Sequence, residues 1–573
     1  MKTKIIFKGI LISALGMMMA GCGDDYLQEK PLTDISAATV SSSEEGARAA
    51  VTGLLRQMQK TYSDLKNSNL NPNGEMFMAV QYGEGLSADA NIGEITNYAT
   101  GSCNPDNIRG GTSWWGAWMY RYCYSIIGSA NTIIGDLPEG DLTDSQNWLM
   151  GCALTMRAHA YWRLMEVYGP RWADSNNGEA YALVMRLKSG EGNEHPLNTC
   201  NEIFDQMYND LKKAIDCFDH TTIRRGDDMF YPDKSVAQGT LARMALLKND
   251  FVTAQQMAHD ARQGYPIMTP EQYIEGFSKK NPEWMWGPAM DPLGVGYYGF
   301  GNHHACNGHY VSETWGYTDS MDYGLYRLLK PTDIRATLYF GPLIVDLMPD
   351  MAAEFGITKE DFFSDKVYLA TKLGISITST GTPPSKAKNK AMLNFIQAYG
   401  NTFLDKRPKS ITPIYSLNKK GMSLGLQYKF QGLDDGYTSC WPPYMRGAEM
   451  LLTEAEAAYH NNDLATAKAC LQELMAKRDP NYSLPADAEL LEEIYLQRRI
   501  ELWGEGHNWF DYKRWNIPYA RKEWNPNDRE NSGGWPKTLV REFPTNWMNG
   551  WRVAIPEREF TYNKEANASL VGL

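Results

Sequence analysis

Two features are scarce in this chain, and each scarcity excludes a class of protein. After the first 22 residues, no stretch approaches the roughly 18 consecutive apolar residues that a membrane-spanning helix needs. The cysteines include no CxxC pair and show no spacing typical of a metal site. The sequence therefore predicts no membrane-spanning helix in the body of the chain, no metal centre and no cofactor.

Positive charge is also in the minority. The chain has 56 lysines and arginines against 68 aspartates and glutamates, a formal charge of −12. Without Lys2, Lys4 and Lys8 of the leader, 53 basic residues remain and the formal charge becomes −15. Such a surface repels nucleic acid and anionic lipid, so neither is an expected partner. Aromatic residues, in contrast, make up 12% of the chain, which indicates exposed aromatic surface.

The first residues have the pattern of a bacterial lipoprotein leader. Three lysines precede an apolar stretch, Ile10–Ala20, that is too short to span a membrane. It ends in Met19-Ala20-Gly21-Cys22, where small residues stand directly before a cysteine. We expect residues 1–21 to be a signal peptide, Cys22 to be lipidated as the only membrane attachment, and 22–43 to form a tether and extended arm. An ordinary secretory signal cut nearby is the alternative.

The rest of the chain predicts a mainly α-helical fold. Residues 62–113, rich in glycine and asparagine, lack periodicity and predict loops. Apolar periodicity and capping signals predict helices over 44–61, 115–134, 146–168, 199–218, 234–248, 445–460 and 487–506, with further helices ending near Arg262 and Lys477.

Two helical pairs resemble each other. Lys234–Lys248 is followed by the residues NDFVTA, and Met445–His460 is followed by NDLATA. Alanines at matching places allow antiparallel helices to pack closely, as in a tetratricopeptide unit. The prediction is a helical-repeat scaffold over 44–263 and 441–573, interrupted by an irregular insertion over 264–440 that carries the ligand site.

Five stretches, in order along the chain, resemble the SusD/RagB family of outer-membrane nutrient-binding lipoproteins. They are Gly21-Cys22 with the following Asp24–Leu27, then RAHAYWRLMEVYGP (157–170), YMRGAEMLLTEAEAAYH (444–460), RRIELWGEGHNWFDYKRW (498–515) and AIPEREFTYN (554–563). The resemblance spans nearly the whole mature chain, and the fourth stretch is the most specific.

This resemblance implies a lipid-anchored protein on the outer membrane, facing the cell exterior. It implies a tetratricopeptide-like scaffold that covers a SusC-like, TonB-dependent transporter and delivers an oligosaccharide to it. Most members of the family bind glycans and some bind peptides, and the resemblance implies no catalytic activity. In this family the segment corresponding to 264–440 is the variable, ligand-facing part.

A glycan site needs exposed aromatic rings that stack on sugar C–H faces, with polar groups that bond the hydroxyls. The predicted platforms are loop aromatics: Trp315, Tyr297, Tyr298, Tyr310, Tyr98, Tyr82 and Trp114. The predicted polar contacts are Asp89, Asn91, Asn97, Asn302, Asn307 and His304. For each of these residues, packing within a loop is the alternative.

Several other motifs are interpreted as structural. Trp284 and Trp286 alternate like a strand that abuts the scaffold. A helix rich in aromatics (Trp115, Trp118, Tyr120, Tyr122, Tyr124) is expected to pack in the core, and Cys152, Cys217 and Cys470 are expected to be small buried hydrophobic residues. The cluster of His303, His304, Cys306 and His309 matches no metal-ligand spacing.

The acidic motifs near the end of the scaffold are also interpreted as structural. Glu505, His507 and Asp511 resemble a catalytic group, but the family resemblance places them in the scaffold. Glu454 and Glu456 lie two apart on a helix, so they point to different sides and cannot act as a paired acid and base. A surface glycoside hydrolase, a structural coat or adhesion protein and a peptide-binding family member remain the alternative functions.

Overall fold

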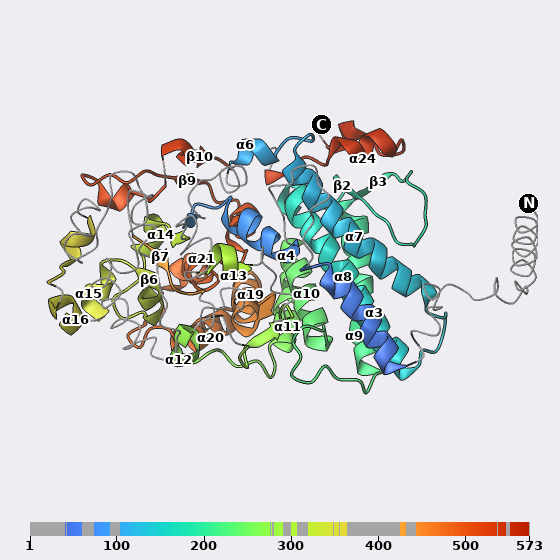
Figure 1. The fold of residues 1–573 in the computed structure, drawn as a ribbon, viewed down its shortest axis with the longest axis horizontal. Coiled ribbons are helices and arrows are strands. Elements are labelled where there is room, and N and C mark those ends of the chain that lie inside the picture. Colours follow the sequence, from blue (N-terminus) through green and yellow to red (C-terminus); the bar gives the residue numbers. More distant parts are fainter. Residues whose placement is uncertain are drawn as a thin grey trace, which may run out of the picture.

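The computed structural model describes residues 41, 43–59, 74–91, 104–275, 277, 280–289, 300–305, 319–347, 349–354, 356–363, 424–430, 440, 443–535, 537–545 and 551–571. Long helices gather at one end of the molecule and the short elements of residues 320–363 lie at the other, with a pair of helical hairpins between them (Figure 1). Among the helices of the described ranges, none combines the length and the apolar character needed to cross a bilayer.

Helix α8 (Asp144–Tyr168) is the centre of the first group of helices. It begins with a capping box, in which Thr143 and Gln146 satisfy each other's backbone amides. Its residues from Trp148 onward are all buried because α3 (Glu44–Arg56), α7 (Trp114–Asp136), α9 (Cys200–Asp219) and α10 (Lys234–Leu247) pack around it. The aromatic residues predicted for the core are buried on α7, with Tyr124 partly buried.

The two similar helical pairs form two hairpins, α10 with α11 (Phe251–Ala261) and α19 (Gly447–His460) with α20 (Leu464–Met475). Their turns are alike, since Asn249 and Asn462 adopt left-handed backbones with φ of 59° and 61°. The matched alanines are buried. Helix α11 packs directly on α19, so the hairpins are neighbours in space although the insertion separates them in sequence. The predicted helical-repeat scaffold is confirmed.

The last helix of the scaffold is shorter than predicted. A 3-10 turn, η9 (Asp487–Glu489), leads into α21 (Leu490–Glu501), and α22 (Asn508–Trp515) follows. The chain turns at Gly506 with φ of 93°, where an added Cβ would lie 2.4 Å from the Ala79 Cα. Gly504, with φ of 79°, is also left-handed, so the chain leaves the helical path before the predicted residue 506.

The loop prediction for residues 62–113 is wrong in part. The described residues form α4 (Gly74–Phe77), a π-helix η2 (Met78–Glu84) and α6 (Pro105–Ile108). Helix η2 packs against α22 and the turn at Gly506. Tertiary contacts therefore produce helices here where the sequence shows no periodicity.

The described part of the insertion has a core of its own, which we call the irregular lobe (residues 270–363 and 424–430). A four-stranded antiparallel sheet in the order β1-β5-β7-β6 links it to the early loops: β1 (Ala90–Asn91), β5 (Ser320–Met321), β7 (Leu426–Gln427) and β6 (Tyr339–Phe340). Short helices surround the sheet: α12 (Pro270–Glu275), α13 (Phe300–His304), α14 (Tyr323–Tyr326), η5 (Ile334–Leu338), α15 (Leu343–Leu347), α16 (Pro349–Glu354) and η6 (Lys359–Phe363). Tyr273, Trp284, Leu338 and Phe430 belong to its hydrophobic cluster.

The lobe joins the scaffold through a short sheet. Strand β4 (Trp284–Trp286) pairs with β8 (Met445–Arg446), and both tryptophans are buried, which confirms their structural interpretation. Small elements complete the molecule: η3 (Trp172–Asp174), β2 (Tyr181–Val184), β3 (Leu197–Thr199), β9 (Tyr519–Arg521), η10 (Arg529–Asn531), η11 (Lys537–Leu539), β10 (Arg541–Phe543), α24 (Glu557–Tyr562) and η12 (Ala568–Val571).

Candidate functional site

The residues predicted to bind ligand separate into two groups. Seven lie outside the described residues, namely Trp315, Tyr297, Tyr298, Tyr310, Tyr98, Asn97 and Asn307, and so does the lipidation residue Cys22. The backbone of Asn302 belongs to α13. The other predicted residues can be placed within the structure.

Tyr82 is not an exposed platform. Its side chain is 1% exposed, and its hydroxyl donates a hydrogen bond of 2.6 Å to the Trp115 carbonyl. Trp114 is partly buried at the start of α7 and stacks on Trp115 with ring centroids 4.3 Å apart. The expectation of an exposed ring is therefore wrong for Tyr82, because η2 folds into the scaffold instead of remaining a loop.

Asp89 and Asn91 also serve the fold. The Asp89 carboxylate pairs with Arg499 at 2.6 Å and accepts a bond from the Tyr512 hydroxyl. The Asn91 amide donates to the Gly534 carbonyl at 3.0 Å. Both side chains are buried, so their prediction as ligand contacts is corrected: they hold β1 against α21 and the later chain.

His304 is buried at the end of α13. Its Nδ1 lies 2.7 Å from an Asp319 carboxylate oxygen, and its backbone carbonyl accepts a bond from Gln427. This placement corrects the prediction of a ligand contact, since the ring joins two elements of the irregular lobe. The described residues contain no group of three His, Cys, Asp or Glu side chains that could hold a metal ion.

The acidic motif of the fourth family stretch lies in the protein interior. Glu505 pairs with Lys429 and Arg446, and Asp511 pairs with Arg498 and Arg514. Burial, together with the nearby Arg498 guanidinium, lowers the pKa of His507 well below its usual range, so the ring is neutral at pH 7. These contacts confirm the structural interpretation of Glu505, His507 and Asp511.

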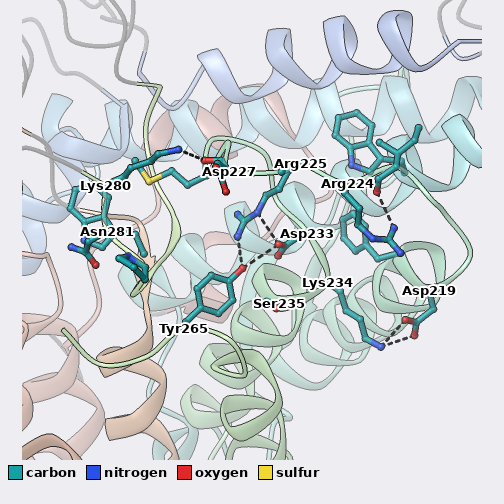
Figure 2. A pocket seen from close by; sticks show the side chains of 17 residues that line it. Asp219, Arg224, Arg225, Asp227, Asp233, Lys234, Ser235, Tyr265, Lys280 and Asn281 are labelled. Atoms are coloured by element: carbon teal, nitrogen blue, oxygen red, sulfur yellow. Dashed lines mark hydrogen bonds and ion pairs between the residues drawn. The ribbon is translucent and has the colours of Figure 1, made fainter. Parts of the chain in front are cut away.

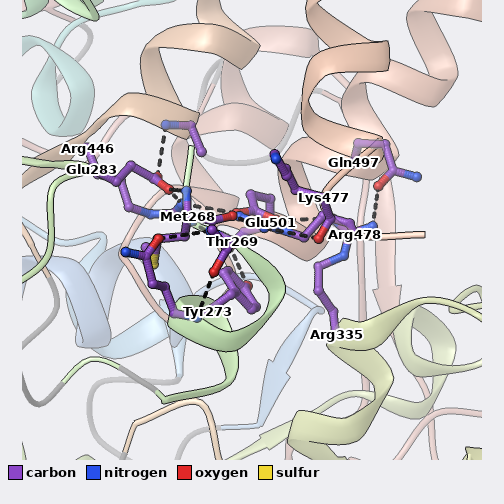
Figure 3. Close-up of polar contacts among 12 residues, drawn as sticks. Met268, Thr269, Tyr273, Glu283, Arg335, Arg446, Lys477, Arg478, Gln497 and Glu501 are labelled. Carbon is purple, nitrogen blue, oxygen red and sulfur yellow. Dashed lines mark hydrogen bonds and ion pairs between the residues drawn. The ribbon is translucent and has the colours of Figure 1, made fainter. Parts of the chain in front are cut away.

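Glu505 belongs to a larger buried group, which we call the charge cluster; Figure 3 labels its members Glu283, Arg335, Arg446, Arg478 and Glu501. Its members come from the lobe and from the scaffold: Glu283, Asp333, Arg335, Lys429, Arg446, Arg478, Glu501 and Glu505. Arg446 contacts three carboxylates at 2.7–3.0 Å. Four cations thus face four carboxylates, and the charge of the cluster is balanced.

The cluster overcomes a large desolvation cost by this pairing. Burial alone would raise the pKa of Glu501, but the guanidinium groups of Arg478 and Arg446 outweigh burial and hold that pKa well below its usual range. Burial also lowers the pKa of Lys429 to about 8 despite its pairing with Glu505. We conclude that this cluster stabilises the junction of lobe and scaffold, because its cations and carboxylates form ion pairs with one another.

A cavity of about 690 Å³ lies at the carboxyl end of α9 and the amino end of α10 (Figure 2). Its volume is in the range of sites that hold small molecules. One wall is apolar, with Trp148, Phe218, Ile223 and Trp284. The other walls are charged: Asp219, Arg224, Arg225, Asp227, Asp233, Lys234 and Lys280.

Sequence reasoning did not identify this cavity. Its residues come from α8, α9, α10, the loop between α9 and α10, and the segment just before β4. Trp284 was interpreted as structural, which its burial confirms, yet it also lines the cavity. The one signal in the sequence was the dense charge of residues 219–235 between two helices, a pattern that ordinary solvated loops share.

Models of known families match both ends of the chain. A model described as "SusD family" matches residues 371–566, and one described as "Starch-binding associating with outer membrane" matches residues 25–246. A SusD-like protein of Bacteroides ovatus is 23% identical over 319 residues. That match covers 52% of this chain and 51% of the relative, so it spans about half of the relative's length.

Solved structures share the fold along nearly the whole chain. A SusD-like carbohydrate binding protein of Bacteroides vulgatus matches with a TM-score of 0.65 and 18% identity, covering 91% of this chain and 97% of its own. A SusD superfamily protein of Bacteroides thetaiotaomicron matches with a TM-score of 0.62 and 16% identity, covering 92% and 99%. The two family models and the SusD-like relative confirm the resemblance to the SusD/RagB family that the sequence predicted, and the solved structures show that the fold is shared.

Proposed function

We propose that this protein is a cell-surface glycan-binding component of a nutrient-uptake complex. In this proposal it is anchored to the outer membrane through lipid on Cys22 and faces the cell exterior. It captures an oligosaccharide and delivers it to a SusC-like, TonB-dependent transporter. It carries out no chemistry on the glycan.

One observation carries the proposal: family models for SusD and for starch-binding proteins associated with the outer membrane match opposite ends of the chain. The scaffold is also suited to the role. The two adjacent hairpins pack on one another, and the β4–β8 sheet joins the irregular lobe to them. Loops held by a rigid frame commonly carry the binding function.

Glu454 and Glu456 have structural partners. Glu454 pairs with His259 and Arg262, whereas Glu456 pairs with Arg514 on another side of α19. These two carboxylates therefore do not face each other as the acid and base of a glycosidase do. A hydrolase would need such a pair elsewhere.

The loop aromatics remain the predicted platforms for sugar stacking, with Trp315 as the leading candidate. We expect Trp315→Ala to weaken ligand binding and to leave the Tm nearly unchanged. Dissociation constants in the ~mM to μM range are expected for a few stacked rings and exposed hydrogen bonds. A large fall in Tm would instead indicate a core position for Trp315.

The test is a comparison of ligand classes. The purified mature protein is applied to a glycan array and, in parallel, to a peptide mixture, and the released reducing sugar is measured on a polysaccharide panel. Retention of glycans without sugar release is expected. Retention of peptides alone would contradict the glycan assignment, and release of reducing sugar would establish the hydrolase alternative.

The location and the transporter are tested separately. Cys22→Ala should release the protein from the outer-membrane fraction, while the wild-type protein should co-purify with a barrel transporter after mild detergent extraction. Persistence of the Cys22→Ala variant in the membrane fraction would refute the lipid anchor. Extraction without any barrel protein would contradict the delivery role and leave glycan binding to stand by itself.

A further inference from the structure

Three aromatic rings from distant parts of the sequence meet at the irregular lobe. Trp524 follows β9, Phe363 ends η6 and Tyr323 begins α14, and β9 and α14 lie at the same end of the molecule (Figure 1). The Trp524 and Phe363 rings are nearly parallel, at 7°, with centroids 5.6 Å apart, and the Tyr323 ring stands edge-on to both. Tyr323 is buried, whereas Phe363 and Trp524 are partly exposed. The group therefore has a buried base and two rings that reach solvent.

Hydrogen bonds hold the loop that carries Trp524. The Asn525 amide donates to the Ser532 hydroxyl at 2.8 Å, across the loop. The Gly534 amide donates at 2.7 Å to the Asp322 carboxylate, which also caps α14. The Trp524 ring is thus held in position before a ligand arrives, and such preorganisation lowers the entropy cost of binding.

Arg529 covers the Phe363 ring. Its guanidinium carbon lies 4.1 Å from the ring centroid, and two of its nitrogens donate to the Glu360 carboxylate at 3.1 Å and 2.9 Å. The two charged groups neutralise each other, and the guanidinium stacks on the ring as arginine commonly does. Phe363 is therefore occupied by Arg529 and by the stack with Trp524.

Trp524 is the ring of this group with unused binding capacity. Within the described part of the chain, its ring contacts only Phe363 and Tyr323, no cation lies over it, and its Nε1 makes no hydrogen bond. This nitrogen has no partner and yet is not buried, so it reaches solvent. A partly exposed indole of this kind offers a flat apolar surface with one free donor at its edge.

Trp515 on α22 shows the opposite case. It is partly exposed as well, but it stacks on Tyr495 with centroids 3.9 Å apart, and the Arg514 guanidinium lies 5.4 Å from its ring. Its Nε1 donates to the Glu456 carboxylate at 2.9 Å. The fold uses both the face and the donor of Trp515, which makes this residue a matched control for Trp524.

The side chains next to Trp524 are suited to hydroxyl groups. Asn525 and Asn527 are exposed, and the Asn525 side-chain nitrogen and both polar atoms of the Asn527 side chain bond no described residue. An amide both donates and accepts, as a sugar hydroxyl requires. The loop carries two cations and three carboxylates, so it has no excess of positive charge that would attract an acid: Lys522, Arg529, Glu523, Asp528 and Glu530.

We propose that Trp524 is a stacking platform for a neutral sugar ring, with its indole N–H and the Asn525 and Asn527 amides serving the hydroxyls. A sugar fits this surface because its C–H face covers a flat indole while its rim presents donors and acceptors. An apolar peptide side chain would cover the ring but would leave the amides unused. The inference rests on the proposed glycan-binding function and adds a site apart from the predicted loop aromatics.

The experiment detects the sugar at the ring itself. The mature protein is mixed with maltoheptaose, cellohexaose or mannohexaose, and with any neutral glycan retained on the glycan array, and calorimetry measures the affinity. Mass spectrometry then measures how fast N-bromosuccinimide oxidises each tryptophan with and without the bound sugar. At ten times the dissociation constant about nine in ten sites are filled, so Trp524 should be oxidised about 10-fold more slowly, and Trp515 at an unchanged rate.

Variants separate the ring face from the N–H. Trp524→Leu keeps an apolar side chain but loses the flat face, so the affinity should fall about 10-fold. Trp524→Phe keeps a ring and loses the N–H, so the affinity should fall only about 3-fold. Trp515→Phe should leave the affinity unchanged, because its donor serves the fold. The Tm of each variant shows whether it is folded.

Each other outcome overturns a defined part of the proposal. Unchanged affinity in a folded Trp524→Leu variant would refute the platform, and so would equal oxidation of Trp524 with and without bound sugar, a result that needs no variant. Glycan binding lost in Trp315→Ala but not in Trp524→Leu would refute this inference and leave the proposed function intact. Retention of acidic glycans alone would refute the neutral-sugar assignment, and failure to bind any glycan would refute the proposed function itself.

Discussion

The charge cluster and the cavity contain the same kinds of side chain, yet they have opposite properties. In the cluster, Arg446 and Glu501 are buried and each contacts several partners of opposite charge. In the cavity, Lys280 is exposed, and its ammonium donates to a single backbone carbonyl, that of Asp227. The difference is one of pairing: groups that satisfy one another stabilise a fold, and groups left unsatisfied beside a cavity are available to a ligand.

The largest effect is expected from breaking the cluster. Arg446→Ala leaves Glu283, Glu501 and Glu505 without their shared partner, so the free energy of unfolding should fall by about 3–5 kcal/mol. Urea unfolding monitored by tryptophan fluorescence measures it. The matched control is Arg529→Ala, whose exposed pair with Glu360 should contribute less than about 1 kcal/mol. Equal losses in the two variants would remove the distinction.

The turn at Gly506 tests whether close backbone packing, in addition to ion pairs, stabilises this part of the protein. Gly506→Ala should cost about 2 kcal/mol or more, because an added Cβ meets the Ala79 backbone at 2.4 Å and φ is 93°. Gly53→Ala within α3 is the control, since nothing lies within 4 Å of its added Cβ. That control should stabilise the protein by about 0.5–1 kcal/mol. Thermal unfolding compares them, and a neutral Gly506→Ala would contradict the close approach.

Glu84 is a buried acid that makes no ion pair with a cation of the described residues, although the charge of Lys429 acts on it. Burial raises its pKa to about 8, although backbone amides of the Gly506 turn bond it. Between pH 4.5 and 8 the Glu84 carboxyl therefore stays protonated in the folded protein, whereas in the unfolded chain it is ionised. Because the folded state then binds more protons than the unfolded state, the free energy of unfolding falls as the pH rises through this range.

Glu84→Gln should remove that dependence. The difference in unfolding free energy between the variant and the wild-type protein should grow in favour of the variant by about 1–3 kcal/mol between pH 5 and pH 8. Urea unfolding at four pH values measures it. A constant difference across this range would show that Glu84 titrates normally.

The smallest effect on stability is expected in the cavity. Lys280→Ala should change the free energy of unfolding by less than about 0.5 kcal/mol, because the side chain is exposed and bonds one carbonyl. Chemical unfolding checks this value beside Lys522→Ala, which removes another exposed lysine, directly after β9. A loss as large as that of Arg446→Ala would mean that Lys280 belongs to the fold, and the contrast between the two regions would fail.

The sequence predicted the scaffold well and the site poorly. Helices such as α8 and α9 carry long periodic patterns and capping residues, and both hairpins share the NDxxTA turn, so local signals were sufficient. The π-helix η2 has no such signal, because contacts with α22 determine it. Tyr82, Asp89 and Asn91 were misassigned for the same reason: their loop became part of the core.

Local sequence patterns could not predict the cavity. Lys280, Trp284 and Arg224 are brought together by the packing of β4 beside the α9–α10 loop, and no spacing in the sequence encodes that approach. The motif around Glu505 was interpreted correctly as structural, but its partners Arg335 and Arg478 could not be named. Pairing across such distances in sequence becomes visible only in the fold.

The most direct test of the account compares the Tm of the wild-type protein with those of Arg446→Ala and Lys280→Ala. We expect Arg446→Ala to melt at least about 2 °C below the wild type, because it leaves three buried carboxylates without their shared partner. We expect Lys280→Ala to melt within about 1 °C of the wild type, because its side chain is exposed and bonds one carbonyl. Equal melting temperatures of the two variants would contradict the claim that mutual pairing of buried charges holds the lobe against the scaffold.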